Sequence, residues 1–336
     1  MNEPIFKIST RILRLVMQIS SRLGEIHATR PAQISPRLRR ENRIKTIHSS
    51  LAIENNTLSL GQVTAILDGK RILGNPVEIR EVQNAADAYE MMFRLNPMSI
   101  PDLLKTHKAL MSDLIKESGV FRSGNVGVFD GDALIHLAPS AKYVPELIAD
   151  LFEWYKKSEL PVLVKSSVFH YEFEFIHPFA DGNGRMGRMW HTLMLGSWNE
   201  IFFWLPIEEL IKERQAEYYG ALGRSDNEGD CTRFVEVMLN IIYDSLEKLD
   251  LTDQDSDQVS DQVSDQDSDQ VSDQVKSLLD ALGSRTLSAS ELMDAMNLTH
   301  RPSFRKNYLS PALQLGLIEM TIPDKPNSRN QKYRRK

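Results

Sequence analysis

The chain has 336 residues, 41% of them hydrophobic, which is enough for a substantial core spread over two or more domains. Its 40 Lys and Arg against 46 Asp and Glu give a net charge of −6, so the protein is acidic overall. The single cysteine, Cys231, excludes an internal disulfide and favours a reducing compartment. No apolar run reaches membrane-spanning length, so we expect a cytoplasmic protein without membrane contact.

Two amphipathic helices are predicted first. Residues 5–19 carry an apolar stripe at helical spacing, and residues 36–55 carry apolar side chains at spacings of three and four. The last turn of the second helix places Ser50 and Glu54 on one face and ends at Asn55. Taken alone, this turn is a polar stripe closed by an Asn C-cap.

A hairpin is predicted after further helices over residues 59–67, 77–95 and 103–115. Residues 125–136 contain two short apolar runs around Asp130-Gly131, which is the strongest local hairpin signal. An isolated hairpin in a helical protein is either decorative or offers an open strand edge. A helix over 143–157 follows it.

Chemically active residues gather between two predicted helices, 163–176 and 186–198. The first helix ends before Pro178, because a residue that precedes proline is disfavoured in the α region, and this leaves His177 facing outward at the helix end. The segment 182–184, Gly-Asn-Gly, then adopts positive φ at little cost and opens onto the second helix.

This junction has the residue types of a polyphosphate site. Glycines before a helix N-terminus direct bare N–H groups at one point. Arg185 and Arg188 project from the same face of the second helix. Their positive charges near the helix N-terminus are unfavourable against the helix dipole, and a bound polyphosphate would account for them. Asp181 is placed to hold a hard cation such as Mg²⁺. Each feature alone is more often structural, but their joint occurrence in one loop favours function.

The stretch resembles the signature of the Fic family, H-x-F-x-[D/E]-G-N-G-R-x-x-R. Every specified position is matched, by His177, Phe179, Asp181, Gly182, Asn183, Gly184, Arg185 and Arg188. The resemblance implies a helical bundle with a β-hairpin flap that transfers AMP from ATP to a Ser, Thr or Tyr hydroxyl of a target protein. It implies that His177 is the general base, that Phe179 anchors the loop and that Asp181 holds Mg²⁺.

The same resemblance implies phosphate-binding roles for the rest of the motif. Asn183 and the amides of Gly182 and Gly184 would hold the α- and β-phosphates. Arg185 would stabilise the developing charge and Arg188 would take the γ-phosphate. Doc-type kinases of the same group carry Lys in place of Gly184, so phosphoryl transfer is the less expected chemistry.

The turn at the end of the 36–55 helix resembles the inhibitory motif of this family, [S/T]-x-x-x-E-[G/N], through Ser50, Glu54 and Asn55. The resemblance implies that Glu54 pairs with Arg188, takes the place of the γ-phosphate and leaves ATP bound unproductively. Keeping such a site about 99% inactive requires only ~2.7 kcal/mol. One partly buried Arg–carboxylate pair supplies that.

Further site residues are assigned by the same resemblance. The hairpin resembles the Fic flap, which docks a target segment by strand addition through Leu134, Ile135 and His136. Two helices, 206–222 and 231–249, follow the motif. The resemblance places the adenine wall at Tyr219, in the first of these helices, and at Asn227, between them, although paired tyrosines are more often core residues.

The chain then repeats Ser-Asp-Gln-Val over residues 252–275, with eight aspartates and no basic residue. Ser and Asp are weak helix formers and one valine in four cannot build a core, so a solvated spacer is favoured over a frayed helix.

A small α+β module is predicted beyond the spacer, with helices over 275–281, 288–296 and 301–315 and two strands within 317–333. This order resembles a winged helix-turn-helix. From Arg301 onward, the sequence contains nine Lys and Arg and two acidic residues. DNA binding is one interpretation, and contact with a protein, including homodimerisation, is the other.

The sequence therefore predicts a mainly α protein in four parts. They are an N-terminal helical region with the inhibitory helix (1–98), a Fic core (99–250), an acidic linker (251–275) and a winged-helix-like module (276–336). The predicted activity is protein adenylyl transfer from ATP with Mg²⁺. Two alternatives are an enzyme that removes AMP, with Glu54 orienting water, and a nucleotide-sensing DNA-binding regulator.

Overall fold

The computed structural model consists of two compact units, Met1–Gln254 and Asp255–Lys336. It describes residues 3–29, 35–130, 133–261, 278–279, 281–283, 285–296, 309, 312–313, 317–321 and 331–335. Within these residues no helix combines the length and the hydropathy needed to cross a membrane.

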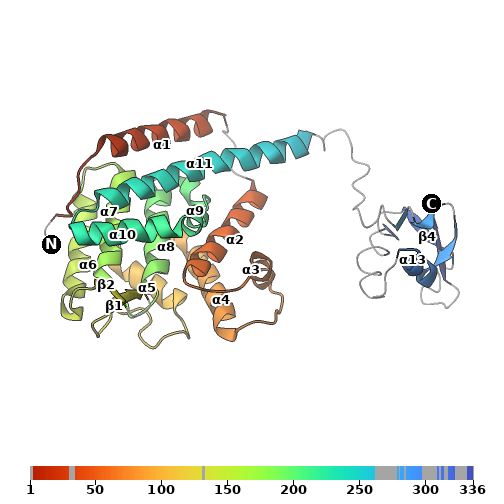
Figure 1. Cartoon of the computed structure of the whole chain (residues 1–336), viewed down its shortest axis with the longest axis horizontal. Helices are drawn as coiled ribbons and strands as arrows, with labels where there is room; N and C mark the ends of the chain where they lie inside the picture. The colour runs from red at the N-terminus through yellow and green to blue at the C-terminus, as the bar shows by residue number, and fades with distance from the viewer. Residues whose placement is uncertain are drawn as a thin grey trace. The chain divides into compact units, whose positions relative to one another are not determined.

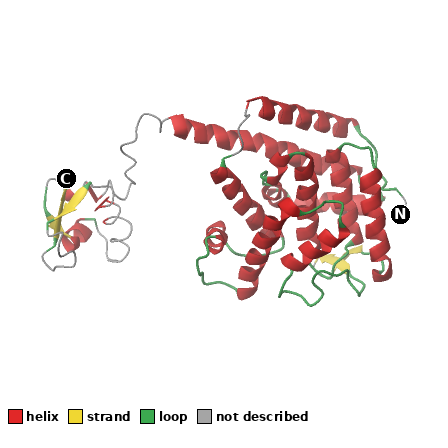
Figure 2. Ribbon diagram, turned by 180° about the vertical axis from the view of Figure 1, so that it is seen from behind, coloured by secondary structure: helices red, strands yellow, loops and turns green. Residues whose placement is uncertain are grey.

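The first unit is a helical bundle with one β-hairpin (Figures 1 and 2). Its helices are α1 (Thr10–Thr29), α2 (Pro36–Ile53), α3 (Leu60–Leu67), α4 (Pro76–Met91), α5 (Ile100–Leu110), α6 (Val144–Lys157), α7 (Val162–Ile176), α8 (Asn183–Trp198), α9 (Ile207–Glu213), α10 (Gln215–Glu228) and α11 (Thr232–Asp261). Three short 3₁₀ segments join them, at Met92–Arg94, Ala141–Tyr143 and Glu200–Phe203. The predicted mainly α fold is confirmed.

Two helices, α7 and α8, form the centre of this bundle. Both are buried on nearly every side, as expected for helices that are apolar around their whole circumference. One hydrophobic cluster packs them against α1, α9, α10 and α11, and a second cluster packs them against α2, α4, α5 and α6. The α7–α8 junction, which carries the motif, is therefore fixed from both sides.

Several element boundaries differ from the prediction; α1, for example, spans Thr10–Thr29 where residues 5–19 were expected. Helix α8 begins at Asn183, three residues before the predicted start, because Gly182 adopts a left-handed conformation (φ 81°) and acts as its N-cap. The predicted 206–222 helix is divided at Arg214, whose φ of −112° leaves the helical region. Helix α11 contains neither Pro nor Gly and continues to Asp261, so the helical alternative holds for the start of the acidic repeat. The remainder of the repeat, 262–275, lies outside the described residues.

The predicted hairpin is present as β1 (Gly127–Asp130) and β2 (Ala133–Leu137), which pair antiparallel. Gly127 faces Leu137 and Asp130 faces Ala133, with an irregularity in register between Val128 and Phe129.

The second unit contains a three-stranded antiparallel sheet in the order β3-β5-β4. Its elements are β3 (Leu287–Ser288), α13 (Ala289–Ala295), β4 (Ile318–Met320) and β5 (Lys332–Arg335). Leu278, Leu282, Leu292 and Tyr333 belong to its core. The helix predicted at 288–296 corresponds to α13, and most of the helix predicted at 301–315 lies outside the described residues. The winged-helix resemblance stays a prediction.

Candidate active site

The motif histidine lies at the end of α7 in a left-handed conformation, with φ 50° and ψ 63°. The buried Arg122 side chain holds this unusual backbone: its Nε donates to the His177 carbonyl at 2.7 Å, and Nη2 donates to the carbonyl of Ile176. Nη1 and Nη2 also donate to the carbonyls of Gly124 and Pro139, which flank the hairpin. Arg122 therefore links the position of His177 to that of the hairpin.

The side-chain amide of Asn183 holds the loop after His177 closed. Asn183 Oδ1 accepts the Phe179 N–H at 2.8 Å, and Asn183 Nδ2 donates to the Phe179 carbonyl at 2.9 Å. Both ends of the Asn183 side chain are thus used within the loop, and its predicted role in phosphate binding stays a prediction. Its backbone N–H remains at the start of α8, where Gly182 provides no side-chain cap.

A buried histidine, His107, packs against the loop. The His107 ring stacks on Phe179 with centroids 3.7 Å apart. Its Nδ1 accepts the Gly119 N–H at 2.9 Å, so Nε2 carries the hydrogen and donates to the Asp181 carbonyl at 3.0 Å. Burial lowers the pKa of His107 to about 4, so the ring is neutral at physiological pH.

His107 predicts a dependence of stability on pH. The pKa of His107 in the folded protein is below the usual 6.5. Its contribution to the free energy of unfolding is therefore complete above pH 6.5 and is lost as pH falls toward 4. Between pH 7 and pH 4 we expect the wild type to lose ~2–3 kcal/mol more unfolding free energy than His107→Gln. Urea unfolding at both pH values measures this, and equal losses would contradict a neutral His107.

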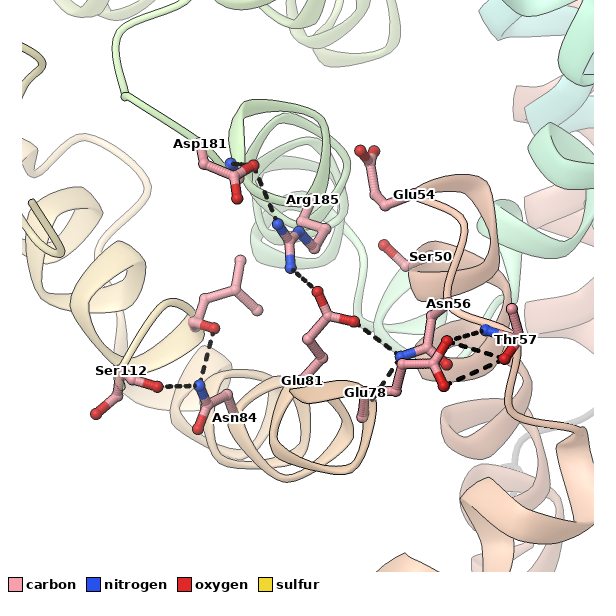
Figure 3. Close-up of polar contacts among 12 residues, drawn as sticks. Ser50, Glu54, Asn56, Thr57, Glu78, Glu81, Asn84, Ser112, Asp181 and Arg185 are labelled. Atoms are coloured by element: carbon pink, nitrogen blue, oxygen red, sulfur yellow. Dashed lines mark hydrogen bonds and ion pairs between the residues drawn. The ribbon is translucent and has the colours of Figure 1, made fainter. Parts of the chain in front are cut away.

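Arg185 lies between two carboxylates (Figure 3). Its Nη1 donates to Glu81 Oε1 at 3.0 Å and its Nη2 to Asp181 Oδ1 at 3.2 Å. Asp181 Oδ1 also accepts the Gly182 N–H at 2.6 Å. The Asp181 side chain is 56% exposed, whereas Arg185 is 5% exposed. The guanidinium is thus fixed beside the N-terminus of α8.

The second motif arginine, Arg188, pairs with the last turn of α2. Its Nη2 donates to Glu54 Oε1 at 2.8 Å and to the Ser50 carbonyl at 2.9 Å, while its Nε donates to Ser50 Oγ at 3.3 Å. Burial by itself lowers the pKa of Arg188, but the charge and hydrogen bond of Glu54, together with Tyr218 and Tyr219, outweigh it and raise the pKa above its ordinary value. The sequence-predicted contact between Glu54 and Arg188 is therefore present.

One buried donor of Arg188 is left over. Within the described residues Nη1 is buried and finds no acceptor. It lies beside Gly184, where an added Cβ would be 2.9 Å from Nη1 and 2.5 Å from Glu54 Oε1. A side chain at position 184 would therefore displace the Glu54 carboxylate or the Arg188 guanidinium from its place in this pair. An unsatisfied cationic donor at this point is suited to an anionic oxygen.

Tyrosines of α10 lie close to this ion pair. Burial, together with the negative charge of Glu54, raises the pKa of Tyr219 to about 12, so its hydroxyl is neutral. Tyr219 stays 45% exposed and contacts the buried Tyr218 edge to face. Asn227 is exposed near the end of α10 and, within the described part of the chain, makes no hydrogen bond or ion pair with the motif. Leu134, Ile135 and His136 lie on β2 of the hairpin, as predicted.

The described residues suit a magnesium ion held together with a substrate. They contain no cluster of three or more His, Cys, Asp or Glu able to hold a metal by themselves. Asp181 instead offers one half-exposed carboxylate beside uncapped helix amides, and Mg²⁺ is typically bound by one or two carboxylates plus substrate phosphates.

Sequence reasoning missed three residues that hold the motif: His107, Arg122 and Glu81. Each contacts the motif through a backbone carbonyl or through one side chain that is distant in the sequence. A lone residue of this kind has no local sequence signal.

Comparison with known proteins identifies the family. Residues 97–195 match the model of the Fic/DOC family, and residues 273–335 match that of the Filamentation induced by cAMP protein Fic-like, C-terminal domain. The crystal structure of a Fic family protein from Desulfovibrio desulfuricans G20 is 47% identical, with a TM-score of 0.72, and the match covers 99% of this chain and 98% of that chain.

Two curated relatives are named protein adenylyltransferase fic-1. The one from Caenorhabditis briggsae is 28% identical over 247 residues, covering 70% of this chain and 46% of the relative. The one from Caenorhabditis elegans is 30% identical over 212 residues, covering 59% of this chain and 39% of the relative. The chain thus spans less than half the length of these relatives. With a solved relative matched over nearly its full length, the motif and the fold agree: this chain belongs to the Fic family.

Proposed function

We propose that this protein is a protein adenylyltransferase that transfers AMP from ATP to a hydroxyl side chain of a target protein and is restrained by its own α2 helix. The observation that carries the proposal is the Glu54–Arg188 pair: a carboxylate from the last turn of α2 accepts from a buried arginine that keeps one further donor unsatisfied. The names of the curated relatives, protein adenylyltransferase fic-1, support the same activity.

The reaction assigns each motif side chain a role. The target hydroxyl oxygen forms a bond to the α-phosphorus, the bond from that phosphorus to the bridging oxygen breaks, and pyrophosphate leaves. His177 takes the hydroxyl proton. Its Nδ1 lies 3.3 Å from the Glu174 carbonyl, so with the hydrogen on Nδ1 the basic nitrogen is Nε2. Mg²⁺, held by Asp181, would neutralise phosphate charge.

Phosphate recognition would come from the N-terminus of α8 and from the arginines. The amides of Asn183 and Gly184 lie in the first turn of α8, where the dipole favours an anion, and the Gly182 amide, bonded here to Asp181 Oδ1, adjoins them. Arg185 would stabilise charge that develops on the α-phosphate, and Arg188 would anchor the γ-phosphate. Tyr219, near Glu54 and Arg188, would line the nucleotide pocket together with Asn227. Strand β2 would dock the target segment through its edge.

The restrained state follows from the same geometry. While Glu54 accepts from Arg188, the γ-phosphate has no arginine and meets a negative charge instead. ATP would then bind with its α-phosphate turned away from in-line attack. Loss of the Glu54 contact would free Arg188 for the nucleotide.

The position of the label distinguishes adenylyl transfer from phosphoryl transfer. We expect Glu54→Gly to incorporate label into protein from ATP labelled at the α-phosphate but not from ATP labelled at the γ-phosphate. Incorporation of the γ-label instead would refute adenylyl transfer. The alternative, removal of AMP with Glu54 orienting water, predicts that the wild type releases AMP from a labelled target faster than Glu54→Gly does.

Asp181 provides a separate test of the metal. In the Glu54→Gly background, Asp181→Ala is expected to lower Mg²⁺-dependent transfer on the order of 100-fold, equivalent to roughly 3 kcal/mol, because the phosphate charge loses its cation. Transfer rates are measured over a Mg²⁺ titration, with EDTA as the zero point. Transfer in EDTA equal to that in Mg²⁺ would contradict the assignment.

A further inference from the structure

One face of α4 carries a row of polar side chains that the proposed reaction does not use. Glu78, Glu81 and Asn84 are three residues apart and project toward the α2 turn, the motif and the end of α5, respectively (Figure 3). Asn84 Nδ2 donates to the carbonyls of Leu110 and Ser112, which fixes α4 against the end of α5. Helix α4 thus has a defined position relative to the motif.

Glu81, in the middle of this row, makes two contacts of different kinds. Its Oε1 accepts from Arg185 Nη1 at 3.0 Å, and its Oε2 accepts from Asn56 Nδ2 at 2.8 Å. The Glu81 side chain is 18% exposed and that of Arg185 is 5% exposed, so solvent screens the pair weakly. Both carboxylate oxygens are therefore engaged, one by the motif and one by the turn after α2.

Asn56 is itself fixed on all sides. It is buried, its Nδ2 also donates to the Glu78 carbonyl at 3.2 Å, and its Oδ1 accepts the Leu58 N–H at 3.1 Å. The next residue, Thr57, donates through its N–H and hydroxyl to the Glu78 carboxylate. The turn that presents Glu54 to Arg188 is thus tied to α4 two residues later.

We propose that Glu81 is a positioning residue that holds the Arg185 guanidinium in its phosphate-facing orientation, and that Asn56 orients Glu81. This inference rests on the proposed function. One turn of chain then acts on both motif arginines in opposite senses. Glu54 pairs with Arg188 and so keeps it from the γ-phosphate. Asn56 instead orients Glu81, which holds Arg185 in place. Release of Glu54 alone activates the protein, while displacement of the whole turn loosens Arg185.

Asp181 cannot substitute for Glu81 in this role. The Asp181 side chain is 56% exposed, and its Oδ1 is shared between Arg185 and the Gly182 N–H. It is also the carboxylate that would hold the cation. The carboxylate of Glu81 lies deeper and approaches Arg185 from a different helix, so it restrains the guanidinium independently of the loop.

The position of Glu81 leads to an unusual kinetic signature. In the Glu54→Gly background, Glu81→Gln removes a negative charge from beside the phosphate site, so ATP affinity is expected to hold or to increase. The transfer rate is nevertheless expected to fall between about 10- and 100-fold, because the arginine loses its fixed orientation. Single-turnover transfer and calorimetric ATP titration measure the two quantities. A rate within twofold of the parent, or a parallel loss of rate and affinity, would overturn the proposal.

Two further variants serve as controls. Glu78→Gln removes a carboxylate one turn earlier on α4, which contacts Thr57 but not Arg185, and transfer is expected to stay within about twofold. Asn56→Asp keeps the acceptor for Leu58 N–H and replaces the donor to Glu81 by an oxygen. We expect it to lower the rate in the parent and to add nothing when Glu81→Gln is already present. Additive losses would contradict orientation through Glu81.

A spectroscopic measurement tests the pair without relying on transfer. In ¹⁵N-arginine-labelled protein, the Arg185 guanidinium signal is assigned by its loss in Arg185→Lys. A guanidinium held by Glu81 rotates slowly and shows separate Nη signals, which are expected to merge in Glu81→Gln and to persist in Glu78→Gln. If the Glu54→Gly parent transfers no AMP, the proposed function fails, but these spectra still decide the positioning role. Unchanged Arg185 signals in Glu81→Gln would refute it.

Discussion

Replacement of His177 by alanine in the Glu54→Gly background is expected to reduce AMP transfer about 10²–10⁴-fold while ATP still binds. The imidazole is the group proposed to accept the target's proton, and it lies at the end of α7 in a left-handed conformation that Arg122 fixes. ATP affinity should change little, because phosphate recognition belongs to the α8 N-terminus and the arginines. Initial rates of label incorporation and calorimetric ATP titration measure the two effects.

His170→Gln is the matched control for His177→Ala. His170 is also a histidine of α7, but it is fully buried and its Nε2 is 3.0 Å from the Tyr218 hydroxyl. We expect this variant to lose thermal stability and to keep a transfer rate nearer to that of the parent than His177→Ala does. Undiminished labelling by His177→Ala would contradict its assignment as the base.

Removal of the Glu54 side chain is expected to act in the opposite direction. Glu54→Gly frees Arg188, and if the pair keeps about 99% of the protein inactive, transfer should rise up to ~100-fold. Glu41→Ala is its control, because Glu41 belongs to the same helix but, among the residues that the structure describes, pairs only with the exposed Arg37. That variant should leave transfer at the wild-type level. Label incorporation per minute at saturating ATP measures both.

Replacement of Arg188, the partner of Glu54, distinguishes an inhibitory role of Glu54 from a purely structural one. Arg188→Ala should be inactive with or without Glu54, because both variants lack the proposed anchor of the γ-phosphate. A solvent-facing, purely structural Glu54 would instead predict at most about 0.5 kcal/mol of lost stability and no gain in transfer. Activity of the double variant equal to that of Glu54→Gly would exclude the anchor role of Arg188.

The parts of the fold that follow from local sequence could be predicted. Helix α7 and its end before Pro178, the hairpin around Asp130, and the positive φ at Gly182 all depend on neighbouring residues. The motif was equally visible, because its residues lie within one loop and one helical turn. The start of α8 at Asn183 and the break at Arg214 were not predicted, whereas the end of α8 at Trp198 agrees with the prediction.

Contacts between distant segments were accessible only where a family pattern pointed to them. The Glu54–Arg188 pair joins residues that are 134 positions apart, and the resemblance of the Ser50–Asn55 turn to an inhibitory motif was its only signal. The Glu81–Arg185 pair spans 104 positions without such a pattern. His107 and Arg122 act on backbone carbonyls, whose positions depend on the folded chain.

The central claim, adenylyl transfer at His177 under the restraint of Glu54, is tested most directly by one labelling experiment. Wild type, Glu54→Gly, Glu54→Gly with His177→Ala, and Glu54→Gly with Arg188→Ala are incubated with ATP labelled at the α-phosphate, and the protein-bound label is measured. We predict strong labelling of Glu54→Gly alone, with the other three proteins near background. Equal labelling of wild type and Glu54→Gly, or retained labelling in the variant that lacks His177, would contradict the account.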